Sequence, residues 1–149
     1  MEPSIPIVYT AAHGGYHPER HPLGGGAAVC WHLVQLWAAD PRVSLTLLAP
    51  GKKPPDFPPA VRYVRLDVLD ENAHPAQLDR REYARFCRRF EAAATGHLER
   101  LAKPPVRRFA VLCNDIAEGV DFRRVAGMGL PIVTIFHVDV ADIFSRLYL

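Results

Sequence analysis

Apolar residues along the chain follow two kinds of pattern, which together predict strands alternating with helices. Short runs that are continuously apolar or nearly alternating are typical of strands in a buried sheet. These predicted strands cover residues 5–12, 43–49, 61–68, 109–113 and 132–136. Between them, apolar residues recur every three or four positions, as on one face of a helix. The predicted helices cover residues 27–39, 78–101, 116–128 and 140 onward.

Glycine and proline mark the connections between these segments. Residues 13–26 hold five glycines and two prolines, and residues 50–59 hold five prolines, so both are predicted as irregular. Gly129 follows the third predicted helix at a position suited to a left-handed cap. Strands alternating with helices indicate parallel pairing with right-handed crossovers. We therefore expect an α/β fold, a Rossmann-like doubly wound parallel sheet flanked by helices.

Length and composition narrow the class of protein. The chain has 149 residues, of which 49% are hydrophobic and 23% charged, so we expect one globular domain. No signal peptide is evident, and no apolar run approaches the ~18 residues that a membrane span needs. The three cysteines are odd in number and lie in apolar runs. We interpret them as reduced core residues, which favours a cytoplasmic protein. We expect no cofactor and no metal.

The charged residues form one local cluster, although the overall charge is small. The formal net charge of +2 is too small to indicate a nucleic-acid partner. Five arginines nevertheless cluster in the first half of the 78–101 helix: Arg80, Arg81, Arg85, Arg88 and Arg89. They are either the solvated face of that helix or a surface for an anionic membrane or phosphate-bearing partner.

The chemistry is expected at one edge of the sheet. Open α/β sheets bind ligands beyond the carboxyl ends of their strands, where the strand order reverses. For the order three-two-one-four-five, this point lies between the first and fourth strands. The glycine-rich loop leaves the first strand, Asn114 and Asp115 leave the fourth, and His137 and Asp139 leave the fifth. We therefore expect these polar groups to share one crevice.

Gly24, Gly25 and Gly26 directly precede a predicted helix. Glycines at the positive end of a helix let an anion approach the backbone closely, so they are a candidate site for a phosphate or diphosphate. A flexible loop tip is the alternative. The nicotinamide pattern G-x-G-x-x-G is not met, because Val29 stands where its third glycine would be.

The remaining candidate site residues are polar, and each could have a structural role instead of a role in binding. His13, His17 and His21 are four apart, but the glycines and proline among them rule out a regular metal-binding helix, so we expect loop histidines that line a cleft. Asp115 has capping-box spacing to Glu118, which leaves Asn114 for a ligand or for turn geometry.

Two further candidates lie late in the sequence, where the fifth predicted strand ends. His137 is either a satisfied core histidine or a site residue. Asp139 is either a site residue or the cap of the last predicted helix.

Three segments, in order, resemble the GT-B glycosyltransferases of family four. The run Gly24-Gly25-Gly26-Ala27-Ala28-Val29-Cys30-Trp31-His32-Leu33 resembles their glycine loop and first helix. The run Val111-Leu112-Cys113-Asn114-Asp115 resembles their fourth strand, which ends in a polar pair. The run Pro131-Ile132-Val133-Thr134-Ile135-Phe136-His137-Val138-Asp139 resembles their fifth strand, which ends in a histidine. The resemblance spans nearly the whole chain.

That family has two Rossmann-like domains facing a cleft, and the resemblance implies that residues 1–149 are the amino-terminal, acceptor-side domain. It implies sugar transfer from a nucleotide-sugar donor to a sugar or lipid-linked acceptor, with retention of configuration and without metal. It further implies that Gly24 to Gly26 lie at the donor diphosphate, that His137 contacts the donor sugar, and that Asn114 and Asp115 help to form the acceptor pocket with His13, His17 and Asp139.

The family's basic pair and glutamate pair belong to its carboxyl-terminal domain, and nothing in this chain matches them. We therefore expect the chain alone to be inactive and to work with its own carboxyl-terminal domain in carbohydrate biosynthesis, in the cytoplasm or at the membrane periphery. Two alternatives remain. One is a dinucleotide-binding domain, although the second strand ends at Ala49 and Pro50 without the acidic residue such domains use. The other is a Rossmann-like interaction module without catalysis.

Overall fold

Five parallel strands form one sheet in the order β3-β2-β1-β4-β5. The structure is a computed structural model that describes residues 4–17, 19, 25–103, 108–115 and 119–135. In chain order, its elements are β1 (Ile5–Thr10), α1 (Gly25–Ala38), β2 (Val43–Ala49), β3 (Arg62–Arg65), the 3₁₀ turn η1 (Pro75–Gln77), α2 (Arg80–Leu101), β4 (Ala110–Cys113), α3 (Phe122–Gly127) and β5 (Ile132–Thr134). The expected doubly wound, Rossmann-like α/β fold is confirmed.

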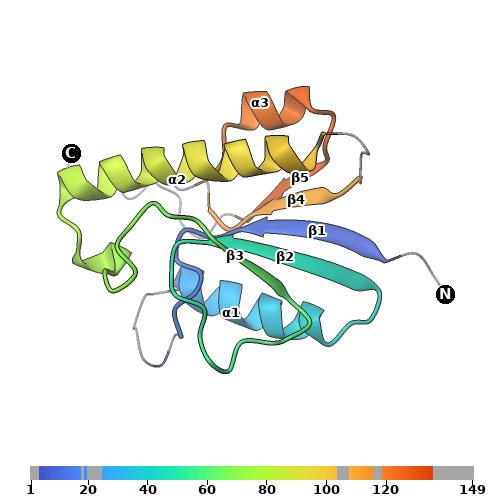
Figure 1. The fold of residues 1–149 in the computed structure, drawn as a ribbon, viewed down its shortest axis with the longest axis horizontal. Coiled ribbons are helices and arrows are strands. Elements are labelled where there is room, and N and C mark those ends of the chain that lie inside the picture. Colours follow the sequence, from blue (N-terminus) through green and yellow to red (C-terminus); the bar gives the residue numbers. More distant parts are fainter. Residues whose placement is uncertain (1–3, 18, 20–24, 104–107, 116–118, 136–149) are drawn as a thin grey trace.

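Helices cover both faces of the sheet, and each face has its own apolar core. Figure 1 shows α1 on one side and α2 with α3 on the other. On the α1 side, Tyr9, Leu47 and Val34 pack together and are almost completely buried. On the other side, Val111 of β4 packs with Phe90 of α2. The strands are apolar on both faces because both faces are covered, which explains their continuous apolar runs.

The long helix α2 begins where the side chain of Asp79 caps it. Asp79 accepts hydrogen bonds from the backbone amides of Arg81 and Glu82, and Glu82 in turn accepts one from the amide of Asp79. This reciprocal capping box satisfies amides that have no partner inside the helix. Phe86 and Phe90 lie on the buried stripe of α2, as the sequence periodicity predicts.

The helix α3 differs most from its prediction. It begins at Phe122 instead of residue 116, and its cap is Asp121, whose side chain accepts from the amide of Arg124 at 3.0 Å. The expected capping of this helix by Asp115 is therefore wrong, and Glu118 lies outside the described residues. The expected left-handed cap is confirmed, because Gly129 has φ 71° just beyond the helix.

Two further sequence-level expectations concern cysteines and membrane spans. All three cysteines are free thiols, with Cys30 and Cys113 buried and Cys87 half-buried. Among the described residues, no helix combines the length and apolar character that crossing a membrane requires. The predicted last helix, from residue 140 onward, lies outside the described part of the chain.

Candidate functional site at the carboxyl edge of the sheet

The strand order reverses between β1 and β4, as predicted. Thr10, the last residue of β1, is the register partner of Cys113, the last residue of β4. Beyond this pair, the amide of Asn114 donates to the carbonyl of Thr10 at 2.9 Å, so the two strands leave the sheet together. α1 then runs along one face and α2 along the other (Figure 1). This is the end of the sheet at which α/β proteins bind ligands.

Asn114 joins three elements at this point. Its side chain is buried, with 3% exposed. Its Oδ1 accepts a hydrogen bond from the hydroxyl of Tyr9, and its Nδ2 donates to the carbonyl of Gly26 at 3.0 Å. Asn114 therefore ties the end of β4 to β1 and to the first turn of α1. The side-chain atoms meet protein groups here, so the direct role of Asn114 is to position the glycine run.

The glycine run lies at the start of α1. Gly25 is the first residue of the helix and Gly26 the second, whereas Gly24 lies outside the described residues. The first turn of α1 contains no acidic residue. The amide dipoles of this turn are therefore not neutralised by a carboxylate of the same turn, and the amino-terminal end of a helix carries partial positive charge.

The loop after β1 is fastened to both sides of the sheet. The Nε2 atom of His13 lies 3.1 Å from the hydroxyl of Tyr83 on α2. His17 lies on the other side: its Nε2 is 3.5 Å from Asp56, and its ring centroid is 4.7 Å from that of Trp31 on α1. The two imidazoles therefore turn toward opposite helices and do not form one pair. His21 lies outside the described residues.

Tyr16, between the two histidines, anchors the same loop to a third segment. Its hydroxyl donates to the carbonyl of Ala73 at 3.2 Å, and its ring meets that of His74 edge-on at 4.6 Å. Burial raises the pKa of Tyr16 to about 12, so the phenol stays protonated and keeps donating over the neutral range.

Backbone packing holds this loop against the loop that follows β2. Gly51 approaches so closely that a Cβ built on it would lie 2.8 Å from the carbonyl oxygens of Gly14 and Gly15. Gly15 has φ 80°, a conformation that favours glycine. The hydroxyl of Tyr63 on β3 donates to the carbonyl of Gly51 and completes the contact.

Asp115 follows Asn114 beyond the end of β4 and is half-buried. Its charge acts on the thiol of Cys87 in α2. The pKa of that thiol is raised mainly by its burial, with a smaller contribution from the charge of Asp115. Asn114 thus contacts α1, whereas the charge of Asp115 acts on Cys87 of α2. His137 and Asp139, the other predicted site residues, lie outside the described part of the chain.

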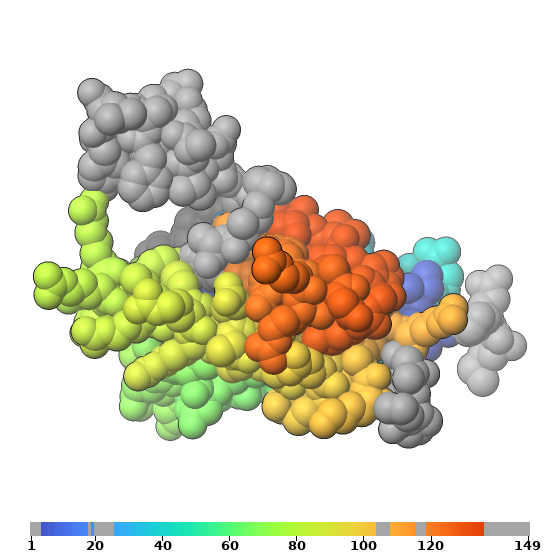
Figure 2. All heavy atoms as spheres, turned by 90° about the horizontal axis from the view of Figure 1, so that it is seen from above, coloured from blue at the N-terminus to red at the C-terminus, as the bar shows by residue number. Residues whose placement is uncertain are grey.

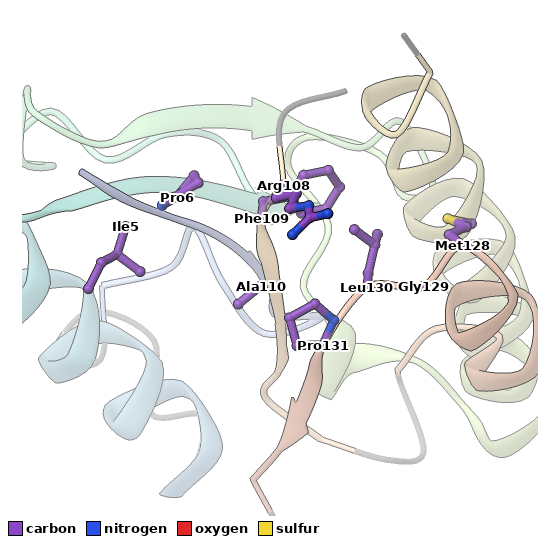
Figure 3. Close-up of a pocket in the computed structure, with 9 residues that line it drawn as sticks. All are labelled: Ile5, Pro6, Arg108, Phe109, Ala110, Met128, Gly129, Leu130 and Pro131. Carbon is purple, nitrogen blue, oxygen red and sulfur yellow. The ribbon is translucent and has the colours of Figure 1, made fainter. Parts of the chain in front are cut away.

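Among the described residues, little space remains beneath the loop. Only about 10 Å³ remains between residues 13–16 and α1, near the lower limit for one water molecule. A much larger hollow of about 680 Å³ lies at the opposite edge, where β1 and β4 begin and residues 128–131 approach (Figure 3). It is mainly apolar, and Arg108 is its only charged lining residue among those described. We assign it no chemistry, because it lacks convergent polar groups.

Sequence reasoning located this edge but missed Tyr9 and Tyr83, the partners of Asn114 and His13. Neither tyrosine carries a sequence signal for these contacts. In the described segments, no three His, Cys, Asp or Glu side chains gather in a way that could hold a metal ion. No model of a protein family matches the chain. No curated protein is significantly similar to it. The fold and the geometry of the carboxyl edge are thus the basis for a functional proposal.

Proposed function

We propose that the chain is the amino-terminal, acceptor-side domain of a GT-B glycosyltransferase, which transfers a sugar from a nucleotide-sugar donor when joined to its carboxyl-terminal domain. One observation carries the proposal: α1 begins at Gly25 and Gly26 beside the carboxyl ends of β1 and β4, where the strand order reverses, and Asn114 binds the carbonyl of Gly26 in that first turn. This is the arrangement in which backbone amides receive a phosphate.

The chemistry of sugar transfer suits such an arrangement. As the bond from the sugar to the diphosphate breaks, positive charge develops on the sugar and negative charge on the departing phosphate. Prearranged amides aimed at that phosphate stabilise the transition state, typically by roughly 3 kcal/mol for one well-placed donor. The first turn of α1 can supply these amides because none of its side chains is acidic. His137 stays the predicted contact to the donor sugar.

The residues at the end of β2 favour a nucleotide-sugar as the ligand over a nicotinamide dinucleotide. A dinucleotide-binding domain places an acidic side chain there to bind the ribose hydroxyls. In this chain, Ala49 ends the strand, and the buried residues Pro50 and Gly51 follow it. Gly51 packs against the backbone of Gly14 and Gly15, which leaves no acceptor for a ribose at this position.

The test is titration of the ¹⁵N-labelled protein with UDP-glucose, GDP-mannose, ADP-glucose and inorganic pyrophosphate, followed by amide NMR. We expect at least one nucleotide-sugar and pyrophosphate to shift the amides of residues 25–28. Gly25→Asp places a carboxylate in the first turn, where it stabilises the helix but repels a phosphate. It should weaken binding at least about tenfold, or about 1.4 kcal/mol.

The matched control is Gln35→Asp, which adds the same charge at an exposed position about 15 Å further along α1. It should leave the affinity nearly unchanged. The proposal fails if none of the probes moves the amides of residues 25–28, or if both variants bind equally well. A parallel titration uses NADH. Preferential binding of NADH over every nucleotide-sugar would instead identify a dinucleotide-binding domain.

A further inference from the structure

One side of α2 carries an unbalanced row of positive charge. Arg81, Arg85, Arg88 and Arg89, here called the arginine ridge, are all exposed. At 3.6 residues per turn they fall within an arc of about 100°, whose centre is roughly opposite the buried stripe formed by Phe90, Ala94 and Leu98. The yellow-green first turns of α2 lie at the molecular surface in Figure 2.

The carboxylates near the ridge are engaged elsewhere. Glu82 accepts from the amide of Asp79 in the capping box, and Glu99 pairs with Arg124 at 2.6 Å. Within the described segments, no acidic side chain forms an ion pair with any of the four ridge arginines. Arginines three and four residues apart repel each other and weaken a helix. The ridge therefore does not serve the stability of the fold.

A hollow of about 220 Å³ lies beside the ridge, between α2 and the residues that follow β3. Arg85 and Arg89 line it together with Glu82, whose carboxylate accepts from the amide of Asp79, and with apolar side chains such as Val68 and Phe86. Guanidinium groups bind phosphate oxygens well, and an apolar floor suits a hydrocarbon group. The combination matches a molecule that carries a phosphate next to an apolar part.

We propose that the arginine ridge docks the protein on an anionic lipid membrane, with phosphate headgroups at Arg85 and Arg89. The inference rests on the charge of the ridge and on the hollow beside it, and it does not depend on the proposed sugar transfer. A nucleic acid fits less well, because its binding sites usually add exposed aromatic side chains for stacking on bases. The large exposed hydrophobic residues of the described segments are Ile5, Leu36 and Val133, none of them aromatic and none on α2.

The experiment is cosedimentation with phosphatidylcholine vesicles, with and without about one-third phosphatidylglycerol. The full chain should bind only the anionic vesicles, and rising salt should release it. Each basic residue near such a surface contributes about fivefold to the binding constant. Arg85→Gln with Arg89→Gln should therefore weaken vesicle binding about 25-fold. Because these arginines repel each other, the melting temperature of that variant should stay the same or rise.

The control variant combines Lys52→Gln with Arg123→Gln, two exposed positions outside α2, in the loop after β2 and on α3, that remove the same charge. It should retain most of the vesicle binding. Equal binding to neutral and anionic vesicles would overturn the proposal, as would equal losses in both variants or a clear fall in melting temperature for the ridge variant. Ridge-dependent binding of a fluorescent single-stranded oligonucleotide without vesicle binding would assign the ridge to nucleic acid instead.

Discussion

The side-chain amide of Asn114 donates to the carbonyl oxygen of Gly26 at 3.0 Å, across 88 residues of sequence. Through this bond the end of β4 determines where α1 begins. Asn114 also accepts from the buried hydroxyl of Tyr9, so one side chain connects two strands and a helix.

Replacing Asn114 with alanine should destabilise the fold and loosen the start of α1. The buried Tyr9 hydroxyl would lose its acceptor, and leaving such a group unsatisfied costs about 1–3 kcal/mol. With the bond to Gly26 also lost, we expect the free energy of unfolding to fall by about 2–3 kcal/mol. Urea denaturation measures this change, and hydrogen exchange should become faster at the amides of residues 27–30.

The matched control is Asn72→Ala, since Asn72 is exposed. Its effect should stay within about 0.5 kcal/mol, as for most surface substitutions. Equal stability of the two variants, or unchanged exchange in α1 of Asn114→Ala, would contradict the connecting role of Asn114.

A methyl group added at Gly51 should disturb the packing of two loops. The new Cβ would lie 2.8 Å from backbone atoms of Gly14 and Gly15, which cannot rotate away as a flexible side chain can. Gly51→Ala should therefore reduce the free energy of unfolding by about 1–3 kcal/mol, as overpacking typically does. Thermal unfolding should show a melting temperature lower by about 2–4 °C for each kcal/mol.

Gly127→Ala is the comparison for this variant. A Cβ at Gly127, the last residue of α3, meets no atom within 4 Å. Because alanine favours helix over glycine, stability should be unchanged or higher by up to about 1 kcal/mol. A Gly51→Ala protein as stable as the Gly127→Ala protein would show that the two loops can separate freely.

Stability should decline in alkali because buried acids ionise later in the folded protein than in the unfolded chain. Burial raises the pKa of the Cys30 thiol from 9.0 to about 12, and that of Tyr16 from 10.0 to about 12. Their stabilising contributions are complete below pH 9 and decrease as pH rises toward 12, because only the unfolded chain loses these protons in that range. In this range each group lowers the free energy of unfolding by about 1.4 kcal/mol per pH unit.

Urea midpoints measured from pH 8 to pH 11.5 test this decline. Tyr16→Phe should make the urea midpoint fall less steeply with pH above pH 10. Between pH 9 and 10 the midpoint should fall as in the unsubstituted protein, because Cys30 still titrates there. A midpoint that stays constant up to pH 11 would be inconsistent with phenol and thiol groups that remain protonated in the folded state.

The sequence predicts elements well where burial alone determines them. Residues 43–49 are confirmed as β2 because a strand covered on both faces must be apolar throughout. The start of α3 is predicted wrongly because Asp115 and Asp121 both have the chemistry of a helix cap. Only the packing of the chain selects Asp121, whose amide bonds to the hydroxyl of Thr95 on α2 at 2.9 Å.

The location of the candidate site could be predicted from the sequence, but the side-chain hydrogen bonds within it could not. Strand order follows from alternation and handedness, so the meeting of β1 and β4 could be anticipated. The link between His13 and Tyr83 joins residues 70 positions apart, and neither neighbourhood in the sequence indicates it. Periodic patterns report which face of an element is buried, whereas a hydrogen bond between side chains depends on the final geometry of several elements.

The backbone contact of Gly51 with Gly14 and Gly15 also has a mechanical consequence. Two neighbouring loops that touch without intervening side chains have no rotamers to absorb a displacement, so they must shift as one body. A molecule that displaces His13 or His17 on arrival would therefore also move Lys52, which follows Gly51 directly. Binding of a molecule at the end of β1 would then change the position of Lys52 while the strands of the sheet stay in place.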